Sequence, residues 1–235
     1  MNRTLNIIYE DKHLLICHKK AGIPVQTSSL TSKDMVSIIK NYLSEHNNKK
    51  GEPYLGLIQR LDQPVEGIII FAKTPLAAKE LSKQQENNLI EKYYFAIVKG
   101  VINKNTGRLE DYIIKDKFAN KAMIVGKNTP NSKSAVLEYN VIDICDNTTL
   151  LDIHLITGRF HQIRAQLSNW GHPILGDRKY STENNADTDF PALCAHKIIF
   201  NHPVSKKRIE FEVAPEGNSF YISWTKSTYL DGRKL

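Results

Sequence analysis

An aspartate on a short loop before an apolar run is the first group in this sequence that could do chemistry. Residues 59–67 read QRLDQPVEG, and the run at 68–72 predicts a strand buried on both faces. Pro64 and Gly67 of this loop restrict where Arg60 and Asp62 can point, as a catalytic loop on a rigid scaffold requires. Taken alone, the loop favours a simpler interpretation, a turn in which Asp62 caps its own backbone.

A second stretch, LDIHLITGRFHQIRAQL at residues 151–167, places a cation beside a predicted apolar face. Its first half alternates apolar and polar side chains and predicts a half-buried strand. A helix is expected next, entered at Thr157 and Gly158, with an apolar face of Phe160, Ile163 and Leu167.

Arg164 lies one helical turn beyond Phe160, at the margin of that face. A guanidinium cannot lose its charge, so this position needs a carboxylate partner or an anionic ligand. Asp62 is a candidate for that partner, although the spacing does not establish the contact.

The elements that position these groups alternate along the chain. Strands are expected at residues 5–9 and 14–17, which form a hairpin, and at 68–72, 92–98, 135–144, 151–155, 198–200 and 208–213. Helices are expected from a start at residues 32–34 to near Ser44, and from Thr74-Pro75 toward Glu86. The polar segment 103–130 predicts hairpins or a long excursion. Helices among non-consecutive strands indicate an α+β fold with a mixed, largely antiparallel sheet.

Composition narrows the class of protein. The 235 residues are 41% hydrophobic, which is enough for one large core, and we expect a single domain. The net charge of +7 favours a polyanionic partner without identifying it. Three cysteines without a CxxC pair argue against a disulfide framework and a zinc cluster, so a cytoplasmic setting is expected. No apolar run approaches a membrane span, and no membrane partner is expected.

Three ordered motifs resemble those of the RluA-type pseudouridine synthases, which are RNA uridine isomerases. The first is Arg60-Leu61-Asp62 with Gly67 and the strand after it. The second is KYYFAIVKG at residues 92–100, with Tyr94 in the place of the family's active-site tyrosine. The third comprises LITGR at 155–159, HQIR at 161–164, GHPILGD at 171–177, and Tyr180. Weaker matches at 10–22 and 193–203 extend the similarity over most of the chain.

The resemblance implies the pseudouridine synthase fold, with flanking helices and a central catalytic cleft. It implies one catalytic domain over residues 1–235 and no separate S4-type RNA-binding domain. Asp62 is then the catalytic residue, and four residues are expected to bind substrate: Arg60, Tyr94, Arg164 and Leu193. In this interpretation Arg60 takes the place of the extruded base, Tyr94 stacks on the uracil, and Arg164 keeps Asp62 ionised.

The implied reaction breaks the N1–C1′ bond of a uridine, rotates the uracil and rejoins it through C5. Because it involves no redox change and no net hydrolysis, we expect neither a cofactor nor a metal. His154, His161 and His172 do not form a ligand set, and ordinary hydrogen bonds are expected for them. Asp62 could attack the sugar, stabilise it electrostatically or take a proton from it, and the sequence leaves these roles open.

The chain departs from the family pattern at three places near these motifs. Gln59 replaces a histidine, Val65-Glu66 replaces a Thr-Ser pair, and Cys194 replaces a histidine after Leu193. These changes bear on the hydrogen bonding around Asp62 and on substrate choice more than on the reaction.

The expected partner is a stem-loop of ribosomal or transfer RNA. Two other functions remain open. A catalytically silent RNA-binding module of the same fold would tolerate loss of the carboxylate. A nucleoside or glycoside hydrolase usually needs two carboxylates flanking the bond, and Glu66 is the only other acid nearby in the sequence.

Overall fold

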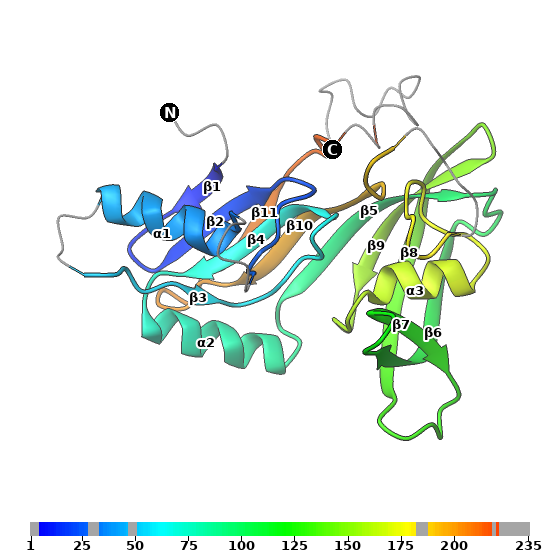
Figure 1. The fold of residues 1–235 in the computed structure, drawn as a ribbon, viewed down its shortest axis with the longest axis horizontal. Helices are drawn as coiled ribbons and strands as arrows, with labels where there is room; N and C mark the ends of the chain where they lie inside the picture. The colour runs from blue at the N-terminus through cyan, green and yellow to red at the C-terminus, as the bar shows by residue number, and fades with distance from the viewer. Residues whose placement is uncertain (1–4, 28–32, 47–50, 182–187, 218–219, 221–235) are drawn as a thin grey trace. The chain divides into compact units, whose positions relative to one another are not determined.

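The computed structural model describes residues 5–27, 33–46, 51–181, 188–217 and 220 (Figure 1). Within these ranges the chain forms strands β1 to β11 and helices α1 to α3, an α+β arrangement. None of the helices in this part of the chain is long and apolar enough to cross a membrane.

The chain divides into two compact units. Unit 1 takes in residues 1–91 and 196–213, and unit 2 takes in residues 92–195 and 214–235. Two of the three boundaries fall within strands β5 (Glu91–Lys99) and β10 (Leu193–Asn201). The single catalytic domain expected from the sequence stays a prediction.

Unit 1 contains the short strands expected near the start of the chain. Its strands are β1 (Asn6–Glu10), β2 (Leu14–Lys19), β3 (Gly56–Leu57), β4 (Glu66–Ala72) and β11 (Arg208–Glu212), together with the second part of β10. The order runs β1-β2-β4-β10, with β3 beside β4 and β11 beside β10. The β1–β2, β2–β4, β3–β4 and β10–β11 pairings are antiparallel. The expected hairpin is therefore confirmed.

Two helices of unit 1 begin at the capping residues that the sequence indicated. Asp34 precedes α1 (Met35–His46), and its Oδ1 accepts from the Ser37 backbone N–H at 2.7 Å. Thr74 is the N-cap of α2 (Pro75–Glu86), and its hydroxyl accepts from the Ala77 N–H at 3.3 Å. Each side chain satisfies a backbone N–H that has no partner inside the helix, which fixes where the helix starts.

Strand β4 is the centre of the unit 1 core, and every residue of it is buried. Ile68 and Ile70 face one way and pack with Leu14 and Ile16 of β2 and with Leu81 of α2. Because successive side chains of a strand point to opposite faces, Ile69 and Phe71 face the other way, and they too are fully buried. The continuous apolar run in the sequence therefore reports a strand covered on both faces. Figure 1 shows α1 and α2 flanking the strands of this unit.

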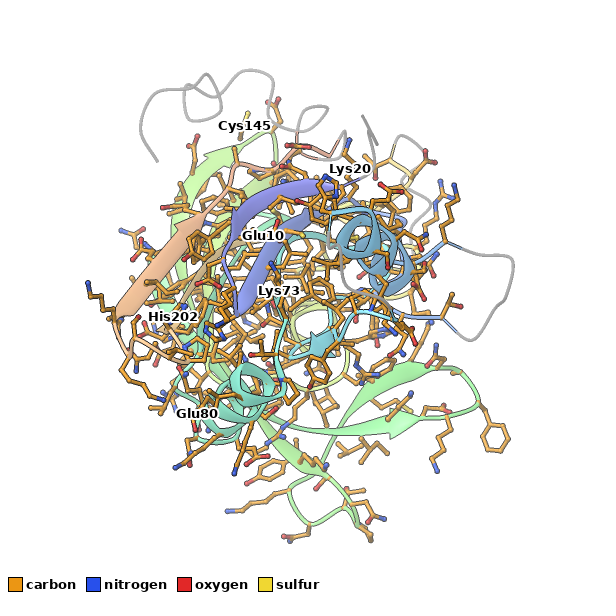
Figure 2. The ribbon with its side chains drawn as sticks, turned by 90° about the vertical axis from the view of Figure 1, so that its left-hand side faces the viewer. Glu10, Lys20, Lys73, Glu80, Cys145 and His202 are labelled. Carbon is orange, nitrogen blue, oxygen red and sulfur yellow. The ribbon has the colours of Figure 1, made fainter. Side chains whose placement is uncertain are left out.

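The turn between β1 and β2 is organised by Asp11. Its Oδ1 accepts from the backbone N–H groups of His13 and Leu14, both at 2.7 Å, and its Oδ2 accepts from His202 Nε2 at 2.8 Å. Nδ1 of His202 accepts from the Val204 and Ser205 N–H groups, so Nε2 carries the ring proton. Beside this turn, Lys73 pairs with Glu10, and both are labelled with His202 in Figure 2. One carboxylate thus ties the first hairpin to the β10–β11 connection.

Loss of the Asp11 carboxylate is expected to destabilise the protein. Burial alone would raise the pKa of Asp11, but the hydrogen bonds from His13, His202 and Leu14 outweigh it and hold the pKa below its ordinary value. The ionised form therefore stabilises the folded state above the unfolded pKa of about 3.9, and this contribution is lost as the pH falls through the lower folded pKa. Asp11→Ala should lower the free energy of unfolding by about 2–3 kcal/mol at pH 7.

Urea unfolding at several pH values measures this effect. Asp11→Asn keeps an oxygen for the backbone N–H groups but turns a second donor toward His202. Its free energy of unfolding should therefore fall by less than that of Asp11→Ala. The deficit of Asp11→Asn relative to wild type should shrink as the pH falls below about 4. A deficit that stays constant from pH 7 to acid conditions would contradict the role given to the charge.

Unit 2 is built on a second run of antiparallel strands. These are most of β5 and then β6 (Thr106–Asp116), β7 (Lys121–Val125), β8 (Lys133–Cys145) and β9 (Thr148–Leu155), in the order β5-β9-β8-β6-β7. The pairings are antiparallel throughout this run. The segment 103–130 is therefore a hairpin at the end of the run, one of the two forms expected. Helix α3 (Gln162–Asn169) packs against β6 and β7 (Figure 1).

Helix α3 starts later than the sequence indicated. The predicted apolar face began at Phe160, but Phe160 lies before the helix, and the N-cap His161 has a left-handed backbone with φ of 50°. The amide of Gln162 organises this end of α3 instead. Its Oε1 accepts from the Thr157 hydroxyl at 2.8 Å and from the Arg159 N–H at 2.9 Å. A side chain inside the helix thus orders the loop before it, which an apolar period cannot reveal.

Candidate active site

The loop carrying Arg60 and Asp62 joins β3 to β4 in unit 1. Leu61 between them is buried, whereas Arg60 is exposed and Asp62 is half-buried. The turn after Asp62 is closed by a backbone bond from the Val65 N–H to the Asp62 carbonyl at 3.0 Å. The backbone therefore closes this turn, and buried Leu61 and Val65 anchor the loop on either side of Asp62.

Lys19 holds this loop in place and was not predicted. Its side chain is fully buried at the end of β2, and its ammonium donates to three backbone carbonyls: Lys20 at 3.1 Å, Ile23 at 2.9 Å and Gln63 at 3.0 Å. Three donors and three acceptors satisfy the ammonium without a carboxylate in contact. Gln63 is also bonded to Gly22 in both directions. The residue after Asp62 is thus fixed to the turn that follows β2.

The Lys19 charge lies within electrostatic reach of Asp62. Burial lowers the pKa of Lys19 to about 8, and the negative charges of Asp62 and Glu66 act in the opposite direction. The only sequence signal for Lys19 was its place at the end of an apolar strand, directly before Lys20 and Ala21-Gly22.

Two departures from the family pattern have defined environments in the structure. Glu66 is buried at the start of β4, and its Oε2 lies 3.6 Å from Nε2 of the equally buried His18 on β2. Val65 fills the core beside it with 2% exposure. The Gln59 amide donates to the Ile68 carbonyl at 3.4 Å, which links the residue before Arg60 to the first half of β4. The buried acid thus has a buried histidine ring as a close neighbour.

Tyr94 lies on β5 in unit 2, opposite Ile153 of β9, and is 8% exposed. The neighbouring Tyr93 points to the other face and stacks on His154 with ring centroids 4.6 Å apart. Tyr94 is therefore held by core packing on a rigid strand, with a small part of its surface accessible.

Arg164 forms a buried bidentate ion pair with Asp177. Its Nε and Nη2 donate to the two carboxylate oxygens at 2.7 and 2.8 Å, and the exposed fractions of the two residues are 4% and 1%. The carboxylate that the sequence required is thus present, and it is Asp177. The pairing of Arg164 with Asp62 stays a prediction. Asp177 lies within the third motif, but nothing in the spacing singled it out as the partner.

The loop geometry around Asp177 is fixed by Gly176. Its φ is +74°, and a Cβ there would lie 2.1 Å from Thr188 Oγ1 and 2.4 Å from the Phe190 carbonyl, so only glycine fits. The Asp177 carboxylate also accepts from the backbone N–H groups of Lys179 and Tyr180. These backbone contacts therefore orient the Asp177 carboxylate independently of Arg164.

Tyr180 lies against the other side of Arg164. The Arg164 Cζ is 5.1 Å from the Tyr180 ring centroid, within the range of a cation–π contact. The Tyr180 hydroxyl accepts from the Ala122 N–H at 2.6 Å and bonds to His161 Nδ1 at 2.9 Å. Arg164 is thus held by both an ion pair and an aromatic ring.

The remaining predicted positions are buried strand residues or ordinary hydrogen-bonding groups. Leu193, at the start of β10, is 3% exposed, and Cys194 after it is fully buried. His172 Nδ1 bonds to the Lys99 carbonyl at 2.8 Å. Within the described residues, no group of three or more His, Cys, Asp or Glu side chains could hold a metal ion.

The chain is similar to proteins of one family along most of its length. A model described as RNA pseudouridylate synthase matches residues 13–169. The chain is 30% identical over 235 residues to an uncharacterised RNA pseudouridine synthase of Aquifex aeolicus, covering 95% of this chain and 73% of that protein. It is 31% identical over 219 residues to ribosomal large subunit pseudouridine synthase C of Vibrio vulnificus, covering 90% and 65%.

A solved structure shows the same fold. Human RNA pseudouridylate synthase domain containing 4 matches with a TM-score of 0.76 at 24% identity, covering 94% of this chain and 92% of that chain. The expected fold is therefore confirmed.

Proposed function

The chain belongs to the RNA pseudouridylate synthase family, and from this membership we propose that it converts particular uridines of structured RNA to pseudouridine with Asp62 as its catalytic residue. The N1–C1′ bond breaks, the C5–C1′ bond forms, and the proton on C5 is finally replaced by one on N1. The product is an isomer of the substrate, so the chemistry requires no oxidant, reductant or net water.

The observation that carries the role of Asp62 is the way its loop is held. Lys19 and Gly22 fix Gln63, and Leu61 anchors the other side, so the carboxylate between them has a defined position next to an exposed arginine. The buried Lys19 ammonium lies within electrostatic reach of this carboxylate. An ionised carboxylate is what attack on the sugar, electrostatic stabilisation or proton removal would each require.

We extend the proposal to three residues of unit 2. Tyr94 would stack on the uracil and keep it in place while it rotates, and Leu193 would contact the base from β10. Arg164 would present its guanidinium to Asp62. The Arg164–Asp177 pair supports that role, because a cation already oriented by a bidentate partner loses little freedom on meeting a second anion.

Arg60 is the proposed substitute for the extruded base. A uridine inside folded RNA cannot reach Asp62 without leaving its stack, which costs a few kcal/mol. Arg60 is exposed and two residues from Asp62, and its planar guanidinium can stack and hydrogen-bond where the base was.

Arg60→Ala is therefore expected to slow the reaction by about tenfold on a stable stem-loop, and less on a loosely stacked RNA. Arg60→Lys keeps the charge but lacks the planar guanidinium. It should therefore recover only the part of the rate that depends on attraction to phosphate. Initial rates on two RNAs with the same target sequence and different stem stability measure the difference. Equal losses on both RNAs would count against this role.

Two other functions are tested by the same product analysis. A hydrolase would release free uracil, and buried Glu66 beside His18 is poorly placed to be its second carboxylate. A catalytically silent binding module would leave RNA unchanged. Mapping pseudouridine in total RNA from cells with and without this protein separates the proposed activity from both alternatives, and an assay for free uracil separates the hydrolase from the silent module. An identical pseudouridine map in both would refute the proposed activity.

The narrower assignments are also proposals. The motif pattern favours the RluA-type group, and the name of the Vibrio vulnificus relative points to large-subunit ribosomal RNA as one substrate class, with transfer RNA as the other. We further propose a cytoplasmic location, where those RNAs are found, and a single catalytic domain formed by both units.

A further inference from the structure

The hairpin formed by β6 and β7 presents an aromatic ring to solvent. Phe118, in the turn between the two strands, is fully exposed. The turn is well defined, because Asp116 Oδ1 accepts from the backbone N–H groups of Phe118 and Ala119 at 2.8 and 3.0 Å, and Asn120 takes a left-handed φ of 47°. Single exposed apolar residues are common. What an exposed ring at the tip of a hairpin can bind depends on the side chains around it.

Those surroundings are basic. Four lysines lie on or beside the hairpin end, and among the described residues none of them forms an ion pair with an acid: Lys115, Lys117, Lys121 and Lys179. Asp116, the acid between them, is occupied by the turn N–H groups. Among the described residues at this end of the hairpin, the four lysines therefore outweigh the single charge of Asp116.

The same hairpin is fixed to the segment 179–180 after α3 and packs against α3 itself. The Ala122 N–H donates to the Tyr180 hydroxyl, and Lys179 Nζ donates to the Asn120 carbonyl at 3.0 Å. A small apolar cluster of Ile113, Ala122, Ala135 and Ala165 fills the space between hairpin and helix. Lys115 lies over the Phe160 ring at 4.3 Å. The tip is therefore held rigidly relative to α3, which carries Arg164.

We propose that this hairpin tip binds unpaired nucleotides of the RNA substrate, with Phe118 stacking on a base and the lysines contacting phosphates. The inference rests on the proposed function and adds a binding surface to it. An aromatic ring interleaved with cations is the combination that single-stranded RNA recognition uses, since every base offers a stacking face. A protein interface would favour a larger apolar centre depleted of lysine, which one ring among four lysines does not supply.

Binding without turnover tests this surface independently of catalysis. The probes are a fluorescein-labelled 20-nucleotide oligouridylate and a labelled 20-base-pair RNA duplex. Phe118→Ala should weaken oligouridylate binding by about fivefold or more and duplex binding much less, and Phe118→Trp should bind as wild type. Leu76→Ala, which removes another exposed apolar side chain on α2, should leave both affinities unchanged.

The lysines predict a change in salt dependence. Lys117→Ala should reduce the slope of log affinity against log salt by about 0.7 on the oligouridylate, and Lys79→Ala on α2 should not. The inference is overturned if Phe118→Ala binds the single strand as wild type, as expected were the tip to dock a protein, or if it weakens both probes equally. Pseudouridine formation is scored separately, so either proposal can fail while the other stands.

Discussion

Asp62→Asn is expected to abolish pseudouridine formation, lowering the rate by on the order of 10⁴-fold or more, while leaving the fold and RNA binding nearly intact. The amide has the shape of the carboxylate but no charge, so it can neither attack the sugar, nor stabilise positive charge on it, nor accept a proton as a base. Because the Asp62 charge raises the pKa of Lys19, its removal should lower that pKa further. The loop should nevertheless hold, since Lys19 is bonded to carbonyls rather than to Asp62.

The measurement is pseudouridine at the mapped position in RNA incubated with the variant, together with oligouridylate affinity and urea unfolding. Asp146→Asn is a matched control, because Asp146 is exposed in the β8–β9 turn at a φ of 45° that asparagine adopts readily. It should react at the wild-type rate. An Asp62→Asn protein that isomerises uridine normally would remove Asp62 from the mechanism.

The sequence predicted elements well where a local signal determines structure. The run 68–72 became buried β4, and Thr74 with Pro75 began α2, because burial on both faces and a capping hydroxyl leave direct traces in the residue pattern. The predicted start of α3, at Thr157 and Gly158, was wrong by about one turn. There a left-handed His161 and the Gln162 amide decide the boundary, and neither changes the apolar period.

The site was predictable only in part for the same reason. Arg60 and Asp62 stand in one short loop with a distinctive pattern, so sequence alone identified them. Lys19 acts on a carbonyl 44 residues away, and which carbonyls a buried ammonium reaches depends on the fold. Arg164 showed that it needed an anion, but its described partner Asp177 lies beyond a loop whose path depends on Gly176. The sequence can thus show that a buried charge needs a partner without identifying which residue that partner is.

Breaking the Arg164–Asp177 pair is expected to cause the largest loss of stability. Arg164→Met leaves a buried carboxylate without its cation, and should lower the free energy of unfolding by about 3–5 kcal/mol. Arg208→Met removes the same kind of side chain from the exposed Arg208–Glu91 pair, and should cost at most about 1 kcal/mol. Urea unfolding of both variants gives the comparison. Similar losses in the two would show that burial does not make the first pair special.

A double variant separates stability from catalysis. Arg164→Met with Asp177→Asn removes both charges, so part of the stability lost in Arg164→Met should return. If Arg164 also acts on Asp62 and the substrate, the double variant stays inactive although its fold is restored. Recovery of pseudouridine formation in parallel with stability would show that Arg164 only supports the loop. Because the guanidinium is held by both Asp177 and the Tyr180 ring, we expect its orientation to serve the reaction, and activity to remain lost.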